Sequence, residues 1–222
     1  MTNEELIKKY CNDNDLNNMI KLHNNINITK NTITEDEEEY NVFEWLCINE
    51  KIEIIKWLNT MLDYNDNKNV INYQNGFIES CKKNKLNMSQ WLYNNKNNIE
   101  LNYNVSFIIC AHLGNIEMCQ WLYSLGEKID IDNISFNYAC AEGHIELLKW
   151  MYLLPNNTIN IHEDYEYPFV SACYNGRLEI CQWLYSLDQK NQIDIHVNND
   201  MPIYNAKLSG NQELINWIEK LG

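Results

Sequence analysis

Cysteine is the residue type in this sequence with the greatest capacity for chemistry. The 222 residues include eight cysteines, and five of them occupy one position of a repeated segment: Cys11, Cys47, Cys81, Cys140 and Cys173. In stacked helices such equivalent residues lie about 8–10 Å apart. A disulfide needs Cα atoms within about 7 Å, and zinc needs its thiolates about 2.3 Å from one point. We therefore expect reduced, buried thiols, with no metal site and no cofactor.

Histidine offers the next candidate metal ligands. His162 and His196 follow equivalent Ile-x-Ile segments, and His144 directly follows a glycine. No repeated segment contains two histidines at a spacing typical of a metal site. The sequence therefore predicts loop and capping roles for these side chains.

Carboxylates are numerous, but their pattern does not indicate catalysis. Five glutamates share one position on the polar face of a repeated helix: Glu53, Glu117, Glu146, Glu179 and Glu213. The acidic run 35–39 lies in the longest linker, where we expect a mobile, hydrated loop, with a docking site for a basic partner as the alternative. There is no Gly-rich phosphate loop, nucleophile elbow or Ser/His/Asp order. The sequence therefore predicts no catalytic residues and a protein that is not an enzyme.

Charge and hydropathy narrow the possible partners. The chain has 31 acidic and 17 basic residues, a formal net charge of −14. Such a surface repels nucleic acid and anionic lipid. No apolar run approaches the roughly 20 residues of a membrane helix, and the first residues lack a secretory pattern. We expect a soluble, cytoplasmic protein that binds neither nucleic acid nor membranes.

These residues lie on a segment that repeats along nearly the whole chain. Tryptophan recurs every 29–34 residues from the second repeat onward, and in the last four repeats a glycine lies seven residues earlier. The tryptophans are Trp57, Trp91, Trp121, Trp150, Trp183 and Trp217; the glycines are Gly114, Gly143, Gly176 and Gly210. A period near 30 residues is typical of stacked repeat proteins. The seven approximate repeats are 1–28, 29–64, 65–98, 99–128, 129–158, 159–190 and 191–222.

Each repeat has three predicted parts. A short helix ends at the glycine position, where glycine can adopt a left-handed conformation. Glu50 tolerates that conformation poorly, so we expect a distorted turn there. A longer helix follows, such as 145–154, with apolar residues at helical spacing. A polar linker then contains a short extended arm at 129–131, 159–161 or 193–195.

The segment Gly143-His-Ile-Glu-Leu-Leu-Lys-Trp-Met-Tyr152 resembles the second helix of the ankyrin repeat. The opening of the first ankyrin helix is present in degraded form in two segments, which resemble it: Tyr167-Pro-Phe-Val170 and Met201-Pro-Ile-Tyr204. The Trp-Leu-Tyr signature is similar to the Asn-rich ankyrin-repeat proteins of amoebae and amoeba-infecting giant viruses. The resemblance implies an all-α solenoid, a single domain over residues 1–222. Tetratricopeptide pairs share the period but lack the arm.

The resemblance also implies a function. In the ankyrin family the concave groove binds proteins through the arm tips and the two residues before the glycine. The positions of this sequence that match the two residues before the glycine are His112, Leu113, Ala141, Glu142, Tyr174, Asn175, Leu208 and Ser209. An acidic arm adds two tyrosines, Tyr165 and Tyr167. We expect a monomeric adaptor or decoy that binds a basic protein, in the host cytoplasm if viral. The alternative is a structural, self-assembling component, for instance of a virion.

The alignment of the repeats leads to several further expectations. Acids of the arms should line one side of the groove: Asp130, Asp132, Glu163, Asp164 and Glu166. The tryptophans should form a half-buried ladder. Thr2 and Glu5 suit a capping box on the first helix. Lys21 and Lys207 replace apolar or small residues in the end repeats, and should therefore be exposed on polar caps.

Overall fold

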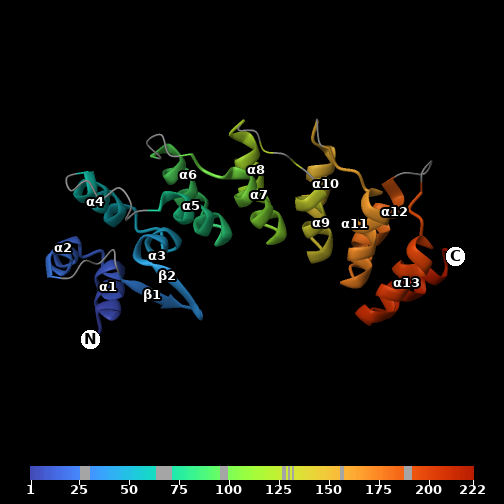
Figure 1. Cartoon of the computed structure of the whole chain (residues 1–222), viewed down its shortest axis with the longest axis horizontal. Helices are drawn as coiled ribbons and strands as arrows, with labels where there is room; N and C mark the ends of the chain where they lie inside the picture. The colour runs from blue at the N-terminus through green and yellow to red at the C-terminus, as the bar shows by residue number, and fades with distance from the viewer. Residues whose placement is uncertain are drawn as a thin grey trace. The chain divides into compact units, whose positions relative to one another are not determined.

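The computed structural model describes residues 1–25, 31–63, 72–95, 100–126, 129, 131, 133–155, 158–187 and 192–222. This part of the chain is mostly helical, with fourteen helices and one two-stranded sheet (Figure 1). The prediction of a mostly helical fold is confirmed. The chain divides into two compact units, Met1–Asn102 and Tyr103–Gly222, which we refer to as unit 1 and unit 2.

Unit 1 contains three helix pairs and a β-hairpin. Its elements in chain order are α1 (Asn3–Asn12), α2 (Leu16–Asn25), β1 (Thr32–Glu35), β2 (Glu38–Asn41), α3 (Val42–Ile48), α4 (Ile52–Asp63), α5 (Tyr73–Lys82) and α6 (Leu86–Asn94). The predicted capping box of the first helix is present, because the Thr2 side chain accepts from the Glu5 amide and Glu5 accepts from the Thr2 amide.

Unit 2 contains four helix pairs. They are α7 (Tyr103–His112) with α8 (Ile116–Ser124), α9 (Asn133–Glu142) with α10 (Ile145–Leu153), α11 (Glu163–Tyr174) with α12 (Leu178–Leu187), and α13 (Val197–Ser209) with α14 (Gln212–Glu219). The first helices α7, α9, α11 and α13 lie side by side, each against the next (Figure 1). They form one layer of the unit.

All seven pairs share one turn, built around a residue with positive φ. The residues are Asn14, Glu50, Asn84, Gly114, Gly143, Gly176 and Gly210. Glu50 has φ 55°, its amide bonds the Cys47 carbonyl at 3.1 Å, and the Lys51 amide bonds the Leu46 carbonyl at 2.9 Å. The same two bonds occur around Asn84 and Gly114. The expected distortion at Glu50 is therefore wrong, because these hydrogen bonds hold a non-glycine residue in the left-handed conformation.

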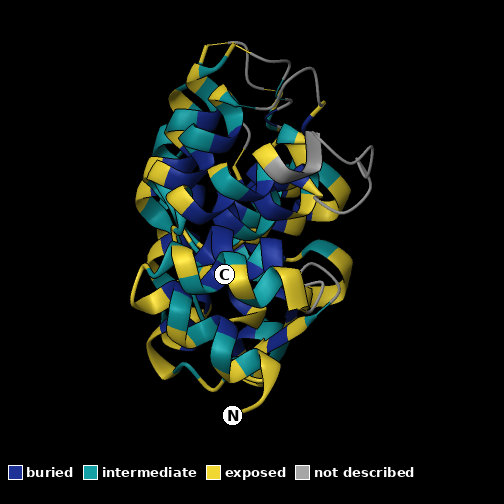
Figure 2. Ribbon diagram, turned by 90° about the vertical axis from the view of Figure 1, so that its left-hand side faces the viewer, coloured by how far each residue is buried: buried dark blue, intermediate teal, exposed yellow. Residues whose placement is uncertain are grey.

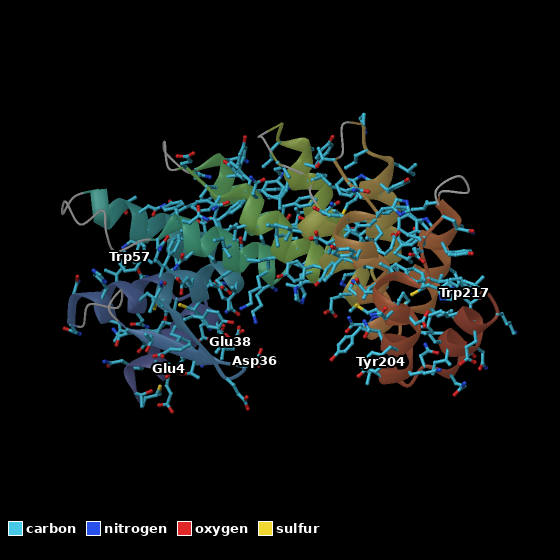
Figure 3. The ribbon with its side chains drawn as sticks, turned by 45° about the vertical axis from the view of Figure 1, so that its right-hand side comes forward. Glu4, Asp36, Glu38, Trp57, Tyr204 and Trp217 are labelled. Atoms are coloured by element: carbon cyan, nitrogen blue, oxygen red, sulfur yellow. The ribbon has the colours of Figure 1, made fainter. Side chains whose placement is uncertain are left out.

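The acidic run 35–39 forms the tip of the β1–β2 hairpin, so the expectation of a mobile loop is wrong. Asp36 and Glu37 adopt left-handed conformations, with φ 50° and 66°, and make a two-residue turn of the kind that suits twisted hairpins. The Thr34 amide donates to Glu4 of α1 at 3.0 Å. Figure 3 shows Glu4 beside this hairpin and Asp36 at its end.

Two carboxylates of the hairpin accept hydrogen bonds from other side chains of unit 1. Glu35 accepts from the Trp45 indole of α3. Glu38 accepts from Lys82 at 3.0 Å and from Lys83 at 2.9 Å, both in or next to α5. The bond from the Tyr40 hydroxyl, with those from Lys83 and Lys82, lowers the pKa of Glu38 to about 2. The hairpin is thus tied to three helices of unit 1, α1, α3 and α5.

The core lies on the facing sides of the helices, where the buried positions gather (Figure 2). All eight cysteines are buried and free, as the repeat position predicted for five of them. Two thiols do meet, since the sulfur atoms of Cys173 and Cys181 lie 3.6 Å apart inside the α11–α12 pair. Alignment along the repeats could not reveal this contact, because it joins two helices of one repeat.

The repeated tryptophans are half-buried, as expected. In the described part of unit 2 their rings contact phenylalanine and tyrosine rings, however, and not the tryptophans of neighbouring repeats. In unit 2 the ring of Trp150 packs on Phe107, with centroids 6.4 Å apart, and edge-on against Tyr123 at 5.8 Å. Trp183 and Trp217 each meet a phenylalanine and a tyrosine of the preceding repeat in the same way. The aromatic column of unit 2 therefore alternates tyrosine with tryptophan.

The end repeats and the arms complete the fold. Lys21 and Lys207 are exposed, as predicted for caps, and Lys207 pairs with Glu219 at 3.2 Å. Ile161 and Ile193 of the predicted extended arms are buried. The described residues of these arms form no strand, and β1 and β2 are the only strands in the described ranges.

Candidate partner-binding surface

Unit 2 presents an unusually apolar face on its first helices. The large apolar side chains exposed there belong to α7, α9, α11, α13 and the turn after α7: Val105, Leu113, Ile134, Tyr138, Tyr165, Tyr167, Tyr174, Met201, Tyr204 and Leu208. Tyr204 projects from α13 in Figure 3. Exposed aromatic and aliphatic residues grouped on one face indicate an interaction surface more strongly than scattered ones do.

Four of these residues are equivalent, each nine positions before the turn glycine. They are Val105, Ile134, Tyr167 and Met201, and every repeat of unit 2 contributes one. The sequence alignment identified only Tyr167 of this set. The available signal was an apolar residue that recurs at this position in every repeat of unit 2. Sequence alone does not show that this residue is exposed, because the residue two positions later is also apolar and belongs to the core in three of the four repeats.

A groove of about 340 Å³ opens on this face, between α9 and the helices on either side. It is lined by His112, Ile134, Asn137, Tyr138, Ala141, Glu142 and Tyr167. Four of the seven were predicted from sequence. The rings of Tyr138 and Tyr167 are 44% and 50% exposed, so much of their apolar surface is open to a partner.

The rim of this groove is polar. The imidazole of His112 stacks on the ring of Tyr138, with centroids 5.1 Å apart, and its Nε2 lies 3.7 Å from Glu142 Oε1. Arg177 Nη2 lies 3.6 Å from the other carboxylate oxygen of Glu142. Both pairs are substantially exposed, so each contributes little to stability and mainly orients the Glu142 carboxylate.

After three of the four turn glycines, the next side chain binds a carbonyl of the preceding repeat. His144 Nε2 donates to the His112 carbonyl at 2.8 Å, and Arg177 Nε donates to the Ala141 carbonyl at 2.9 Å. Asn211 Nδ2 donates to the Gly176 carbonyl at 2.8 Å. The rim residues of one repeat are thus positioned by the next repeat.

Left-handed segments position the tyrosines at the start of α11. Asp164, Tyr165 and Glu166 all have positive φ, and so do the equivalent residues 198–200 near the start of α13. His162 Nδ1 lies 2.9 Å from Glu166 Oε2. The other carboxylate oxygen of Glu166 accepts from the Asp194 amide of the next repeat at 3.3 Å. Glu166 is 8% exposed, so its predicted role as a surface acid is wrong. Its position beside His162 and the next repeat buries it.

The two histidines of the arms occupy N-cap positions without capping the helix backbone. His162 precedes α11 and His196 precedes α13, and neither side chain bonds the helix amides. His196 Nδ1 instead lies 2.6 Å from Asp200, matching the pair between His162 and Glu166. Their place at the helix starts is as expected, but the expected capping role is wrong, because each side chain pairs with a carboxylate four residues later.

The remaining predicted site residues lie around the groove without lining it. Leu113, Tyr165, Tyr174 and Leu208 are exposed at helix ends. The side chain of Asn175 donates to the Ser171 carbonyl, and that of Ser209 bonds the Ala206 carbonyl, so both are engaged within their own turns. Among the arm acids, Asp164 is exposed and Glu163 is partly buried. Asp130 and Asp132 lie outside the described residues.

Comparison with family models and with curated proteins finds no match to this sequence. None of the helices in the described ranges has the length and apolarity needed to cross a membrane. Nor do three or more histidine, cysteine or acidic side chains gather into a potential metal site within that part of the chain. The groove and the apolar face around it therefore stand as the best-defined candidate site.

Proposed function

We propose that this chain is an ankyrin-type repeat protein, whose helix pairs stack and present the first helices to a partner protein. The shared left-handed turn and the bonds that link each turn to the next support this assignment. The motif around Gly143 resembles the family, and His144 of that motif makes one of these bonds. Stacked repeats commonly use such an extended surface for binding.

The observation that carries the proposal is the row of exposed apolar side chains, one per repeat of unit 2. Val105, Ile134, Tyr167 and Met201 repeat at a position where a soluble helix ordinarily places a polar residue. Tyrosine is among the side chains that supply most of the binding energy in protein interfaces, and the buried centre of an interface is more apolar than its rim. We infer a binding protein and not an enzyme.

Charge selects the class of partner. Residues 103–222 contain 15 acidic and 6 basic side chains, a net charge of −9 for unit 2. A basic protein is attracted to such a surface, and association slows as salt rises. Self-assembly through the same face is the second candidate, but copies of a chain with net charge −14 repel each other. We therefore expect a monomer at all accessible concentrations, which sedimentation can measure.

The test begins with affinity capture of the partner by the full chain, followed by its purification. Replacement of Tyr165, Tyr167 and Tyr174 together by alanine should abolish binding of the purified partner, with an unchanged circular dichroism spectrum. The matched control replaces three exposed residues of the second helices, Glu117→Ala, Gln120→Ala and Gln182→Ala. Equal affinity of the tyrosine variant and the wild type would exclude this surface.

A further inference from the structure

The groove on α9 contains hydrogen-bond acceptors that the protein does not fully use. Asn137 lines it, and the Oδ1 atom of this residue is buried without a hydrogen-bond partner in the described part of the chain. Its amide turns easily about the last side-chain torsion, so a donor in the groove can reach this oxygen. Glu142 adds a carboxylate that lies 3.6 Å from the Arg177 guanidinium and 3.7 Å from the His112 imidazole.

The walls of the groove suit a flat, cationic group on an apolar stem. Tyr167 is half-exposed, Tyr138 is 44% exposed on the side away from the stacked His112, and Ile134 and Ala141 offer aliphatic surface. A guanidinium stacks on aromatic rings and donates several hydrogen bonds in one plane, whereas an ammonium is a compact and more strongly hydrated charge. An arginine side chain thus matches the rings, the aliphatic wall and the acceptors together.

A purely apolar anchor fits less well. It would cover Glu142 and bury its carboxylate further, and it would leave Asn137 Oδ1 without a donor. Burying a polar group without a partner is unfavourable, and more so for a charged one. Arg177 shows that a guanidinium is already accommodated at this rim, where it bonds the Ala141 carbonyl and approaches Glu142 Oε2.

We propose that the groove lined by Asn137, Tyr138, Glu142 and Tyr167 binds an arginine side chain of the partner protein. This inference rests on the proposed function and names the chemistry that the partner must bring. The net charge of −9 on unit 2 favours the same class of partner. The arginine stem packs on Ile134 and Ala141, and its guanidinium lies against the two tyrosines.

The inference is testable without knowing the partner. The probes are four acetylated pentapeptide amides, Gly-Ser-X-Ser-Gly, in which X is arginine, citrulline, lysine or norleucine. Each is titrated into the isotope-labelled full chain and followed by NMR. We expect the arginine peptide to shift saturably the side-chain amide of Asn137 and the backbone amides of Tyr138 and Ala141. Its affinity should exceed that of the citrulline peptide by about tenfold, because citrulline keeps the shape and loses the charge.

Substitutions in the groove sharpen the result. Asn137→Asp should strengthen binding of the arginine peptide several-fold, and Asn137→Leu should weaken it. Glu142→Gln should weaken it about tenfold, whereas Glu179→Gln, which removes an exposed acid of α12, is the control for net charge. Tyr167→Ala should weaken binding, with Tyr204→Ala as a control outside the groove.

Two outcomes would overturn the inference. Equal or tighter binding of the norleucine peptide would show that the groove takes an apolar anchor. Equal binding of arginine and lysine peptides, with the same loss in Glu142→Gln and Glu179→Gln, would show attraction to overall charge alone. If the partner still depends on the tyrosine face while either result holds, the arginine site is wrong and the proposed function stands. Loss of the tyrosine dependence would instead reject the proposed surface itself.

Discussion

The two units build the same turn from different residues. Unit 1 uses Asn14, Glu50 and Asn84 at the left-handed position, whereas unit 2 uses four glycines. A Cβ atom at Gly114 would lie 2.5 Å from the imidazole of His144, so this glycine is required by the next repeat as well as by its φ of 72°. The left-handed conformation alone therefore does not demand glycine. Close approach of the neighbouring repeat does.

The residue after the turn also differs between the repeats. In unit 2 it reaches back to the preceding repeat, as His144 and Arg177 do. In unit 1 Asp15 occupies this position and accepts a hydrogen bond from the Asn18 amide of its own helix. Three of the four glycines of unit 2, Gly114, Gly143 and Gly176, are thus approached by side chains of the next repeat. The same contacts hold the rim of the candidate binding groove.

The largest expected effect is on the aromatic column. Trp150→Ala removes a ring that packs on Phe107 and Tyr123, and should lower the free energy of unfolding by about 3–5 kcal/mol. Trp217 has the same two kinds of partner in the preceding repeat, so Trp217→Ala should cost a similar amount although it lies in the last repeat. Urea denaturation of both variants measures the difference. Negligible losses at both sites would show that the column contributes no packing.

Substitutions at the turn test the comparison directly. Gly114→Ala should cost about 2–3 kcal/mol, because it adds displacement of His144 to the left-handed strain of about 1–2 kcal/mol. Gly210→Ala is the matched control, since open space surrounds its Cβ position and only the strain remains. In unit 1, Glu50→Gly should instead gain about 0.5–1 kcal/mol. Equal costs at Gly114 and Gly210 would contradict the role of the neighbouring repeat.

The hairpin of unit 1 should make stability depend on acid pH. The pKa of Glu38 falls from 4.5 to about 2 through its bonds to Tyr40, Lys83 and Lys82, so its contribution is complete above pH 4.5 and disappears as the pH falls toward 2. Glu38→Gln should lower the thermal midpoint at pH 7 and leave it unchanged near pH 2. The control is Glu39→Gln at an exposed position of the same strand. A constant difference between wild type and Glu38→Gln across this range would refute the assignment.

The smallest effect is expected from thiol reagents. Burial raises the pKa of Cys11 to about 12 and that of Cys140 and Cys181 well above the ordinary value, so native thiols should not react. After denaturation without reductant, all eight should be titrated. A count of six would indicate a disulfide, and Cys173 with Cys181 would be the first pair to examine because their sulfur atoms are in contact.

Much of the fold was predictable because it depends on periodic patterns. The helix pairs, the buried cysteines, the half-buried tryptophans and the capping box at Thr2 all follow from spacing along the chain. The hairpin at 32–41 was not predicted, because the acidic run hides its alternation and its carboxylates find partners such as Lys82 only in three dimensions.

The candidate groove was predicted in part for a similar reason. His112, Ala141, Glu142 and Tyr167 follow from the resemblance to ankyrin repeats, and all four line it. Ile134 and Tyr138 were missed, since apolar residues on a helix are ordinarily assigned to the core. Only the packing of α9 between its neighbours shows that these two face outward.

The alternating tyrosines and tryptophans have an optical consequence. Tyr123, Tyr152 and Tyr185 each lie edge-on to the tryptophan of the next repeat, at 5.8, 5.9 and 5.7 Å. At such separations an excited tyrosine passes its energy to the indole before it can emit. The emission of these tyrosines should therefore be quenched while adjacent repeats of unit 2 are in contact. It should reappear when one repeat separates from the next. The protein thus contains an intrinsic spectroscopic gauge of repeat-to-repeat contact.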